Sequence, residues 1–308
     1  MQAISWSSRT GFLFAAIGFA VGLGNIWRFH WVVGENGGSA FVLVYLLCVV
    51  AIGIPILMAE LLIGRRGQGS PPAALEHLAT EQGVTKQWRW LGNLNLLTAF
   101  LIQIVYTVVI GWVLYYLYVS VFQGFDGLTA ISSKAAFGDV KADPGLMMVW
   151  TGVALALACG IVFSGVEKGI EPAVRVLMPM LFLLLVGLAI FNAFHDGFVD
   201  ALAYLFTPDF SKVTGATVLA AVGQAFFSIG VAMAGMMMFA AYLPKDVSIG
   251  QSAGIIVGAD TLVALTAGLV IFPVVFRFEV AVEESGSGLI FETLPVAFAQ
   301  MPLKLSLQ

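Results

Sequence analysis

The stretch Gly18-Phe-Ala-Val-Gly22-Leu-Gly24-Asn25-Ile-Trp-Arg28 lies within the first hydrophobic run of the chain. It is apolar enough to enter a bilayer, yet three glycines and an asparagine stand where a membrane helix normally carries Leu, Ile or Val. Each glycine costs about 1 kcal/mol of helix propensity relative to alanine, which favours opening of the helix at mid-membrane depth. Opened backbone survives there only where protein, water, ions or a ligand satisfy it, so the stretch predicts a binding site.

The same glycines allow a simpler interpretation. Gly18 and Gly22 are four residues apart. Pairs of small residues at this spacing are common where two membrane helices pack closely, because they let the backbones approach. On this segment alone, helix packing and helix opening explain the glycines equally well.

The composition predicts an integral membrane protein. The 308 residues are 60% hydrophobic and 10% charged, with a mean hydropathy of +0.97, whereas ordinary soluble domains are roughly 25% charged. About seven apolar runs approach or exceed the roughly 20 residues that a helix needs to cross a bilayer. They lie near residues 11–33, 41–63, 91–122, 146–163, 173–194, 216–242 and 253–278. The first run lacks the form of a cleaved signal peptide, so we expect it to be retained.

The distribution of basic residues predicts a cytoplasmic N-terminus. With that orientation the inner side carries Arg9, Arg65, Arg66, Lys86, Arg89, Lys168, Arg175 and Lys245. The outer side carries Lys134, Lys141, Lys212, Arg277 and Lys304. An inner excess of Lys and Arg is the usual pattern. The net charge of −4 and the lack of a basic patch exclude nucleic acid as a partner, and Cys48 and Cys159 lie within spans, where free thiols behave as small hydrophobes.

The sixth apolar run repeats the anomaly of the first. It contains Gly223, Gly230 and Gly235 together with Gln224 and Ser228. Two glycine-interrupted spans five helices apart are typical of an inverted repeat whose broken helices form a site near the bilayer midplane. We therefore expect one membrane domain over residues 1–308, with a first repeat at about 9–194 and an incomplete second repeat at about 213–308.

Two acidic residues within spans are candidates for function. Asp260 lies in the middle of the seventh run, where a carboxylate costs about 2.5–3.5 kcal/mol on insertion scales. A structural, hydrogen-bonded acid is the alternative. Glu60 lies in the second run, and it is close enough to the inner end that its side chain could also reach the membrane surface.

Four separated motifs together resemble the neurotransmitter:sodium symporter family, in its bacterial branch. They are Ala20-Val-Gly-Leu-Gly-Asn-Ile-Trp-Arg-Phe29, Glu35-Asn-Gly-Gly38, Gly223-Gln-Ala-Phe-Phe-Ser228 and Leu294-Pro-Val-Ala-Phe298. The resemblance covers the chain in order, and it implies an all-α LeuT-type bundle in the bacterial cytoplasmic membrane. It further implies sodium-coupled uptake of an amino acid by alternating access, without enzymatic activity or an organic cofactor.

The resemblance also implies two sodium sites. The first would use the Ala20 carbonyl, Asn25, Ser228 and Asp260. The second would use the Gly18 and Val21 carbonyls together with residues beyond this sequence. Animal relatives bind chloride at positions that match Tyr45, Gln224 and Ser228 and have asparagine in place of Asp260. The acid at 260 therefore implies independence of chloride.

The implied substrate site holds a neutral amino acid with a hydrophobic or aromatic side chain. Its carboxylate would meet the Gly24 amide and the Tyr106 hydroxyl. Relatives that carry amines have an aspartate in place of Gly22, so the substrate must supply its own carboxylate. The remaining pocket residues would be Ala20, Phe227, Ser228, Gly230 and Met233. Arg28, Tyr106 and Phe227 would form the extracellular gate.

Some features depart from the family. His30 replaces the usual proline, and no arginine precedes Trp6, where the family has an intracellular gate residue. The family continues beyond Gln308 into helices that complete the second sodium site and provide the acid that pairs with Arg28. We therefore expect Arg28 to lack its acidic partner and residues 1–308 alone not to transport.

Alternative functions follow from these departures. The chain could be a non-transporting partner of a full-length relative, associating with it, with further copies of itself or with the absent C-terminal helices. An intramembrane enzyme is disfavoured because His30, His77 and His195 fall at loops or span ends, where no catalytic set is evident.

Overall fold

The computed structural model describes residues 6–277 and 288–300, and the regular elements within these ranges are helices. The helices are α1 (Arg9–Ala20), α2 (Phe29–Glu35), α3 (Ser39–Cys48), α4 (Ile54–Gly67), α5 (Pro71–Glu81), α6 (Arg89–Phe122), α7 (Ala130–Ala142), α8 (Pro144–Phe163), α9 (Glu171–Ala193), α10 (Phe198–Phe206), α11 (Gly215–Ile229), α12 (Gly235–Ala240), α13 (Ile249–Arg277) and α14 (Leu294–Gln300). Short π-helical or 3-10 turns join them at η1 (Gly24–Arg28), η2 (Val49–Gly53), η3 (Lys86–Trp88), η4 (Val166–Ile170), η5 (Phe210–Lys212) and η6 (Leu289–Thr293). The expectation of an all-α fold is confirmed.

Most of the expected membrane spans are present. Five continuous spans are long and apolar enough to cross a bilayer, at Ser39–Gly67, Lys86–Phe122, Pro144–Phe163, Val166–Ala193 and Ile249–Arg277. A sixth is the pair Arg9–Ala20 and Gly24–Glu35, whose two helices are bent by 48°. The run expected at 216–242 is instead divided between α11 and the six-residue α12, so neither part alone reaches spanning length.

The first span opens at its glycines. Helix α1 ends at Ala20, and regular structure resumes with η1 at Gly24. A Cβ atom on Gly18 would lie 3.4 Å from the Met178 sulfur of α9, whereas one on Gly22 would have no described atom within 4 Å. Gly18 therefore serves helix packing and Gly22 lies in the opening, so each of the two sequence interpretations applies to one glycine.

The second break follows Ile229. Gly230 takes a left-handed conformation at φ 73°, and α12 begins only at Gly235. Ala232 and Ala234 between them also have positive φ, at 63° and 64°. A left-handed conformation costs a non-glycine residue roughly 1–2 kcal/mol. The chain therefore holds this opening against a local preference, which requires compensating contacts from the surrounding helices.

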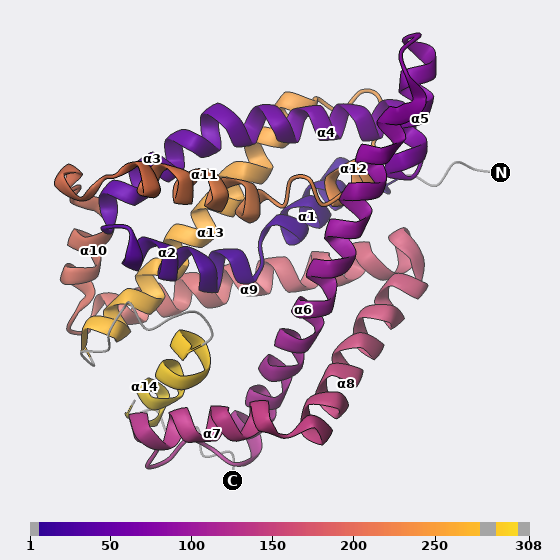
Figure 1. Cartoon of the computed structure of the whole chain (residues 1–308). Coiled ribbons are helices and arrows are strands. Elements are labelled where there is room, and N and C mark those ends of the chain that lie inside the picture. The colour runs from indigo at the N-terminus through magenta and orange to yellow at the C-terminus, as the bar shows by residue number, and fades with distance from the viewer. Residues whose placement is uncertain (1–5, 278–287, 301–308) are drawn as a thin grey trace.

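Helix α13 lies at the centre of the bundle. It runs diagonally behind α4 and α11 in Figure 1 and contacts α1, α4, α9, α10 and η1. Half of its most apolar segment is buried, against 6% for α8 and 17% for the α6 span. Helices α6 and α8 run side by side along one edge of the molecule (Figure 1). The centre of the fold therefore consists of the two broken spans and α13.

A cap of aromatic residues closes one end of the bundle. Helix α7 packs against η6 and α14, shown together in the lower part of Figure 1. Ser133 Oγ donates to Glu292 O at 2.6 Å, and the Phe137 and Phe291 rings stack at 5.1 Å. The motif at 294–298 begins α14, although the side chains of Ala297 and Phe298 lie outside the described residues, as does Lys304.

Gly64 sets the distance between α4 and α12. A Cβ atom at this position would lie 2.1 Å from Met237 O, a backbone atom that cannot move aside by rotation. We expect Gly64→Ala to lower the free energy of unfolding by roughly 1–3 kcal/mol because the core becomes overpacked. Thermal unfolding in detergent measures this effect.

The matched control is Gly187→Ala in α9, where a new Cβ would meet no described atom within 4 Å. It should leave stability unchanged or raise it by up to about 1 kcal/mol, the difference in helix propensity. Equal effects of the two substitutions would contradict the close packing of α4 and α12.

Candidate functional site

Three fully buried polar side chains meet where the two breaks face α13. Asn25 comes from η1, Ser228 from the last turn of α11 and Asp260 from the middle of α13. Asn25 Nδ2 donates to Asp260 Oδ1 at 2.8 Å and to Asp260 O at 3.0 Å, and it lies 3.2 Å from Ser228 Oγ. Ser228 Oγ donates to Asp260 Oδ2 at 2.6 Å. The structure thus brings together the three side chains predicted for the first sodium site.

This cluster has the donor chemistry that a sodium ion requires. It combines one carboxylate, one hydroxyl and one amide with nearby backbone carbonyls, all of them hard oxygen ligands. The Asn25 amide nitrogen now lies among three of these oxygens, while its Oδ1 accepts from the Gly22 amide at 3.0 Å. For Asn25 to offer oxygen to a cation beside Asp260, its amide would have to turn over and exchange these two roles.

Of the chloride-site equivalents, Tyr45 reaches the cluster and Gln224 does not. Tyr45 Oη donates to Ser228 Oγ at 3.3 Å. Gln224, one turn before Ser228, accepts from Arg28 and donates to Gly24 O at 3.4 Å. The Arg28 guanidinium also lies 4.8 Å from the centre of the Phe227 ring. Within the described residues the Arg28 guanidinium thus contacts an amide oxygen and an aromatic face, and both compensate its charge.

A cavity of about 290 Å³ lies beside the cluster. It is lined by six of the seven residues predicted to bind substrate, namely Ala20, Gly24, Tyr106, Phe227, Gly230 and Met233. Ser228, the seventh, belongs to the buried polar cluster instead. Gly18 and Val21, predicted for the second sodium site, also line the cavity. The two helix breaks and α6 therefore enclose one ligand-sized space.

Tyr106 and Phe227 separate this cavity from a second one. Their ring centres are 6.5 Å apart, and both side chains line both cavities. The second cavity measures about 350 Å³, and its remaining lining comes from η1, α2 and α6, with Trp27, Arg28 and Trp31 among the residues. The three residues predicted as a gate thus lie at or beside the boundary between two spaces.

Glu60 satisfies the backbone of the second break. Its side chain is buried, and Oε1 accepts a hydrogen bond from Ala232 N at 2.6 Å. The alternative that this carboxylate extends to the membrane surface is therefore wrong. A carboxylate from α4 instead compensates one of the strained positions between α11 and α12.

The position expected for His30 at a span end is also wrong. The ring is fully buried within α2, with Nδ1 at 2.9 Å from Ile26 O and Nε2 at 3.2 Å from Ala264 O. A neutral imidazole can donate from only one nitrogen. The contact with Ala264 links α2 to α13 one turn after Asp260, so His30 supports the arrangement of the site.

Several cavity residues were not identified from the sequence as binding residues. Phe19, Ala99, Ile102 and Gln103 all line the smaller cavity. Those on α6 occupy positions 99, 102, 103 and 106, the spacing of a single helical face. This pattern is present in the sequence, but the span also carries polar residues such as Asn95 and Thr107 that do not line the cavity, so the sequence alone does not reveal which face meets the ligand.

Comparisons with known proteins agree with this geometry. Residues 4–127 and 135–307 match the family described as "Sodium:neurotransmitter symporter family". An uncharacterized sodium-dependent transporter of Bacillus subtilis, YhdH, is 36% identical over 98% of this chain and 66% of its own length. The sodium-dependent neutral amino acid transporter SLC6A17 of Rattus norvegicus is 27% identical over 88% of this chain and 40% of its own.

The fold has a counterpart among solved structures. The crystal structure of MhsT in complex with L-phenylalanine matches with a TM-score of 0.89 and 40% sequence identity. The match covers 97% of this chain and 67% of MhsT. The chain therefore spans about two thirds of the length of the bacterial relatives that it matches.

Removing the Asn25 amide should destabilise the site. Asn25→Ala deletes donors to Asp260 and Ser228 and the acceptor for the Gly22 amide. We expect the free energy of unfolding to fall by about 1.5–3 kcal/mol, the usual loss for a hydrogen bond to a charged group. Thermal unfolding of detergent-purified protein measures it. Asn36→Ala, which removes one bond to Val32 O in the same helix, is the control; an equally large loss there would contradict a special role for the cluster.

Proposed function

We propose, on the premise that this chain belongs to the sodium:neurotransmitter symporter family, that it carries the substrate cavity and the first sodium site of a sodium-coupled symporter. The substrate is a neutral amino acid with a hydrophobic or aromatic side chain. Relatives in this family are sodium-coupled transporters and not enzymes, and the chain is a multi-pass membrane protein.

One observation carries this proposal: the cavity and the buried oxygen cluster share the same two helix breaks. Gly24 lines the cavity, and the next residue, Asn25, belongs to the cluster. On α11, Phe227 likewise lines the cavity and the next residue, Ser228, belongs to the cluster. A ligand in the cavity and a cation in the cluster would thus be held by adjacent residues, which makes the binding of each dependent on the other.

The shape and chemistry of the cavity support an amino acid as the ligand. Its wall combines aromatic and apolar side chains with opened backbone, and its volume of about 290 Å³ lies at the small end of ligand sites. Gly24, the first residue of η1, lies at the cavity wall, and a backbone amide at the start of a helical segment favours a carboxylate. No described acidic side chain lines the cavity, so the wall offers no partner for an amine alone. MhsT, a structural relative of this chain with 40% sequence identity, was solved in complex with L-phenylalanine.

Asp260 is the proposed ligand that removes the need for chloride. Its carboxylate contacts Asn25 and Ser228 directly, and Tyr45 reaches the same serine. A fixed negative charge at this point stabilises an adjacent cation in surroundings of low dielectric constant. A chloride ion would supply the same charge in a protein that lacked the acid.

The proposal also includes a second sodium site, two structural repeats and the membrane in which the chain lies. The second sodium site would use the Gly18 and Val21 carbonyls, which lie at the cavity wall. The two-repeat organisation, at about 9–194 and 213–308, is consistent with breaks in the first and sixth expected spans. An N-terminus on the inner side follows from the distribution of Lys and Arg, and a bacterial cytoplasmic membrane is the location that the resemblance to the bacterial branch implies.

Substrate class can be tested by binding. In the presence of sodium, we expect the purified protein to bind L-phenylalanine, whereas its decarboxylated amine should compete at least about tenfold more weakly. The reason is that only the amino acid brings a carboxylate to the Gly24 amide and the sodium ion. Scintillation proximity with radiolabelled phenylalanine measures both ligands, with potassium replacing sodium as the control. Displacement by the amine at equal concentration would refute the assignment.

The role of Asp260 can be tested by substitution. Asp260→Asn should raise the sodium concentration needed for half-maximal binding by about tenfold or more, because the cation loses a charged ligand. Added chloride should restore part of that affinity, while the unmodified protein should not respond to chloride. Gluconate at equal ionic strength is the control. Unchanged sodium dependence in both anions would show that Asp260 is not a sodium ligand.

A further inference from the structure

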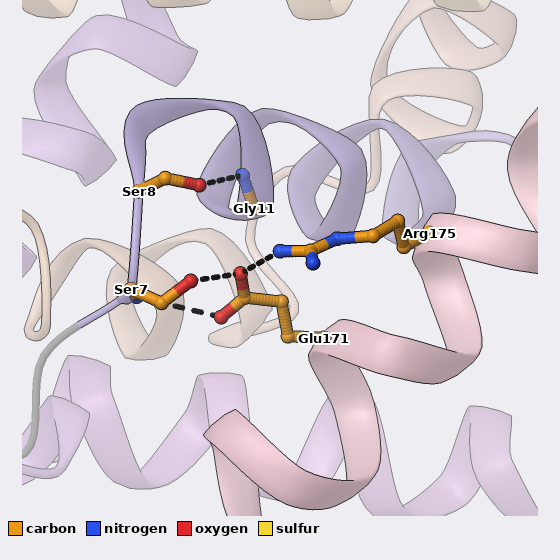
Figure 2. Close-up of polar contacts among 5 residues, drawn as sticks. All are labelled: Ser7, Ser8, Gly11, Glu171 and Arg175. Carbon is orange, nitrogen blue, oxygen red and sulfur yellow. Dashed lines mark hydrogen bonds and ion pairs between the residues drawn. The ribbon is translucent and has the colours of Figure 1, made fainter.

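A buried carboxylate joins the beginnings of α1 and α9. Glu171 is the first residue of α9, and only 2% of its surface is exposed. Ser7 Oγ donates to Glu171 Oε1, Ser7 N lies 3.4 Å from Oε2, and Arg175 Nη2 donates to Oε1 at 2.7 Å. Figure 2 shows the carboxylate between the two partners, with Ser7 on one side and Arg175 on the other.

The surrounding backbone leaves space for this carboxylate. A Cβ atom on Gly11 would lie 2.3 Å from Glu171 Oε1, so any larger residue would displace the acid. Ser8, directly after Ser7, caps α1 by accepting from Gly11 N at 3.0 Å (Figure 2). Two turns further along α1, Gly18 packs against Met178 of α9. The two helices therefore touch along a glycine-lined contact that Glu171 closes at one end.

An ordinary acid at a helix N-terminus does not account for this arrangement. Such an acid interacts with the helix dipole and with Arg175 in its own helix, and both effects stay within α9. The Arg175 side chain is 60% exposed, so that pair alone contributes little. Ser7, by contrast, belongs to the segment before α1. The two hydrogen bonds of Ser7 therefore connect the Glu171 carboxylate of α9 to the N-terminal end of α1.

The position of α1 depends on contacts at its N-terminal end because its C-terminal end, at Ala20, is followed by the break in the span. Helix α1 has 12 residues and is thus about 18 Å long, and it is separated from η1 by residues 21–23. Other polar contacts of the described residues also hold its beginning: Trp6 Nε1 donates to Phe239 O at 2.8 Å, Trp6 N donates to Tyr242 O at 3.4 Å, and Arg9 donates to Gln251 at 3.0 Å. None of these three reaches α9. At its far end α1 carries Ala20 at the wall of the cavity.

We propose that Glu171 is a positioning residue that, through Ser7, holds α1 against α9 and thereby fixes the cavity end of α1. Loss of this contact lets α1 separate from α9 and exposes the surface between them to water. Its consequence for sodium binding rests on the function proposed above, because Ala20 belongs to the proposed first sodium site. The separation of the two helices is a property of the fold and does not depend on that function.

The experiment measures access to the contact between the helices. Met178 is buried where Gly18 packs. Met178→Cys, in the full chain with both native thiols removed by Cys48→Ala and Cys159→Ser, therefore reports separation by its reaction with a water-soluble maleimide. In sodium-free buffer without amino acid, Glu171→Gln and Ser7→Ala should each raise the labelling rate by about tenfold, equivalent to about 1.4 kcal/mol. The double variant should label no faster than the faster single variant.

Two conservative variants separate positioning from general destabilisation. Ser7→Thr keeps the hydroxyl and should label like the parent. Glu167→Gln removes an exposed acid from the preceding turn and should also label like the parent. If Glu171→Gln fails to fold, as judged by gel filtration, the comparison of Ser7→Ala with Ser7→Thr decides. Equal labelling of Ser7→Ala, Ser7→Thr and Glu167→Gln would overturn the proposal.

A second measurement links the contact to ligand binding. Ser7→Ala should raise the sodium concentration for half-maximal phenylalanine binding, and Ser7→Thr should not. A parent protein that shows no sodium-dependent binding would refute the proposed function, while the labelling rates would still test Glu171. Faster labelling with an unchanged sodium midpoint would overturn the effect on the sodium site.

Discussion

The central constraint on this structure is that backbone opened inside a membrane must find partners within the protein. A bilayer offers no water to an unpaired amide, so each break in a helix needs polar groups of the protein as partners. At the first break Asn25 accepts from the Gly22 amide. At the second, Glu60 reaches from α4 to the Ala232 amide. Each compensating side chain is buried, and each is fixed by the helix that carries it.

The same compensation creates the candidate site. Asn25 satisfies the first break with its oxygen and contacts Asp260 and Ser228 with its nitrogen. A cation that binds the Asn25 amide oxygen must therefore remove the hydrogen bond that this oxygen accepts from the Gly22 amide. Ion binding and backbone arrangement at the cavity are coupled through one side chain, which is a physical route from the sodium site to the ligand site.

Helix α13 fixes the relative positions of the helices around the site. Besides Asp260, it offers the Ala264 carbonyl to His30 and the Val270 carbonyl to Asn192 of α9. Its neighbours α1 and α2 are the two halves of the broken span. The Arg28 charge, which the sequence suggested would be uncompensated, lies against Gln224 and the Phe227 ring. Polar groups of these helices thus form hydrogen bonds with one another that water would supply in a soluble protein.

The sequence by itself determined the class of protein, the places where helices open and the membership of the family. Glycine clusters at 18–24 and 223–235 weaken helices locally, and this effect is readable without any neighbour. Only the tertiary structure decided which side chains meet. Glu60 and His30 proved to be buried, and Gln224 faces Arg28, because the partners Ala232, Ala264 and Arg28 lie far away in the sequence. The face of α6 that lines the cavity was likewise hidden, because, of its polar residues Asn95, Gln103 and Thr107, only Gln103 lines the cavity.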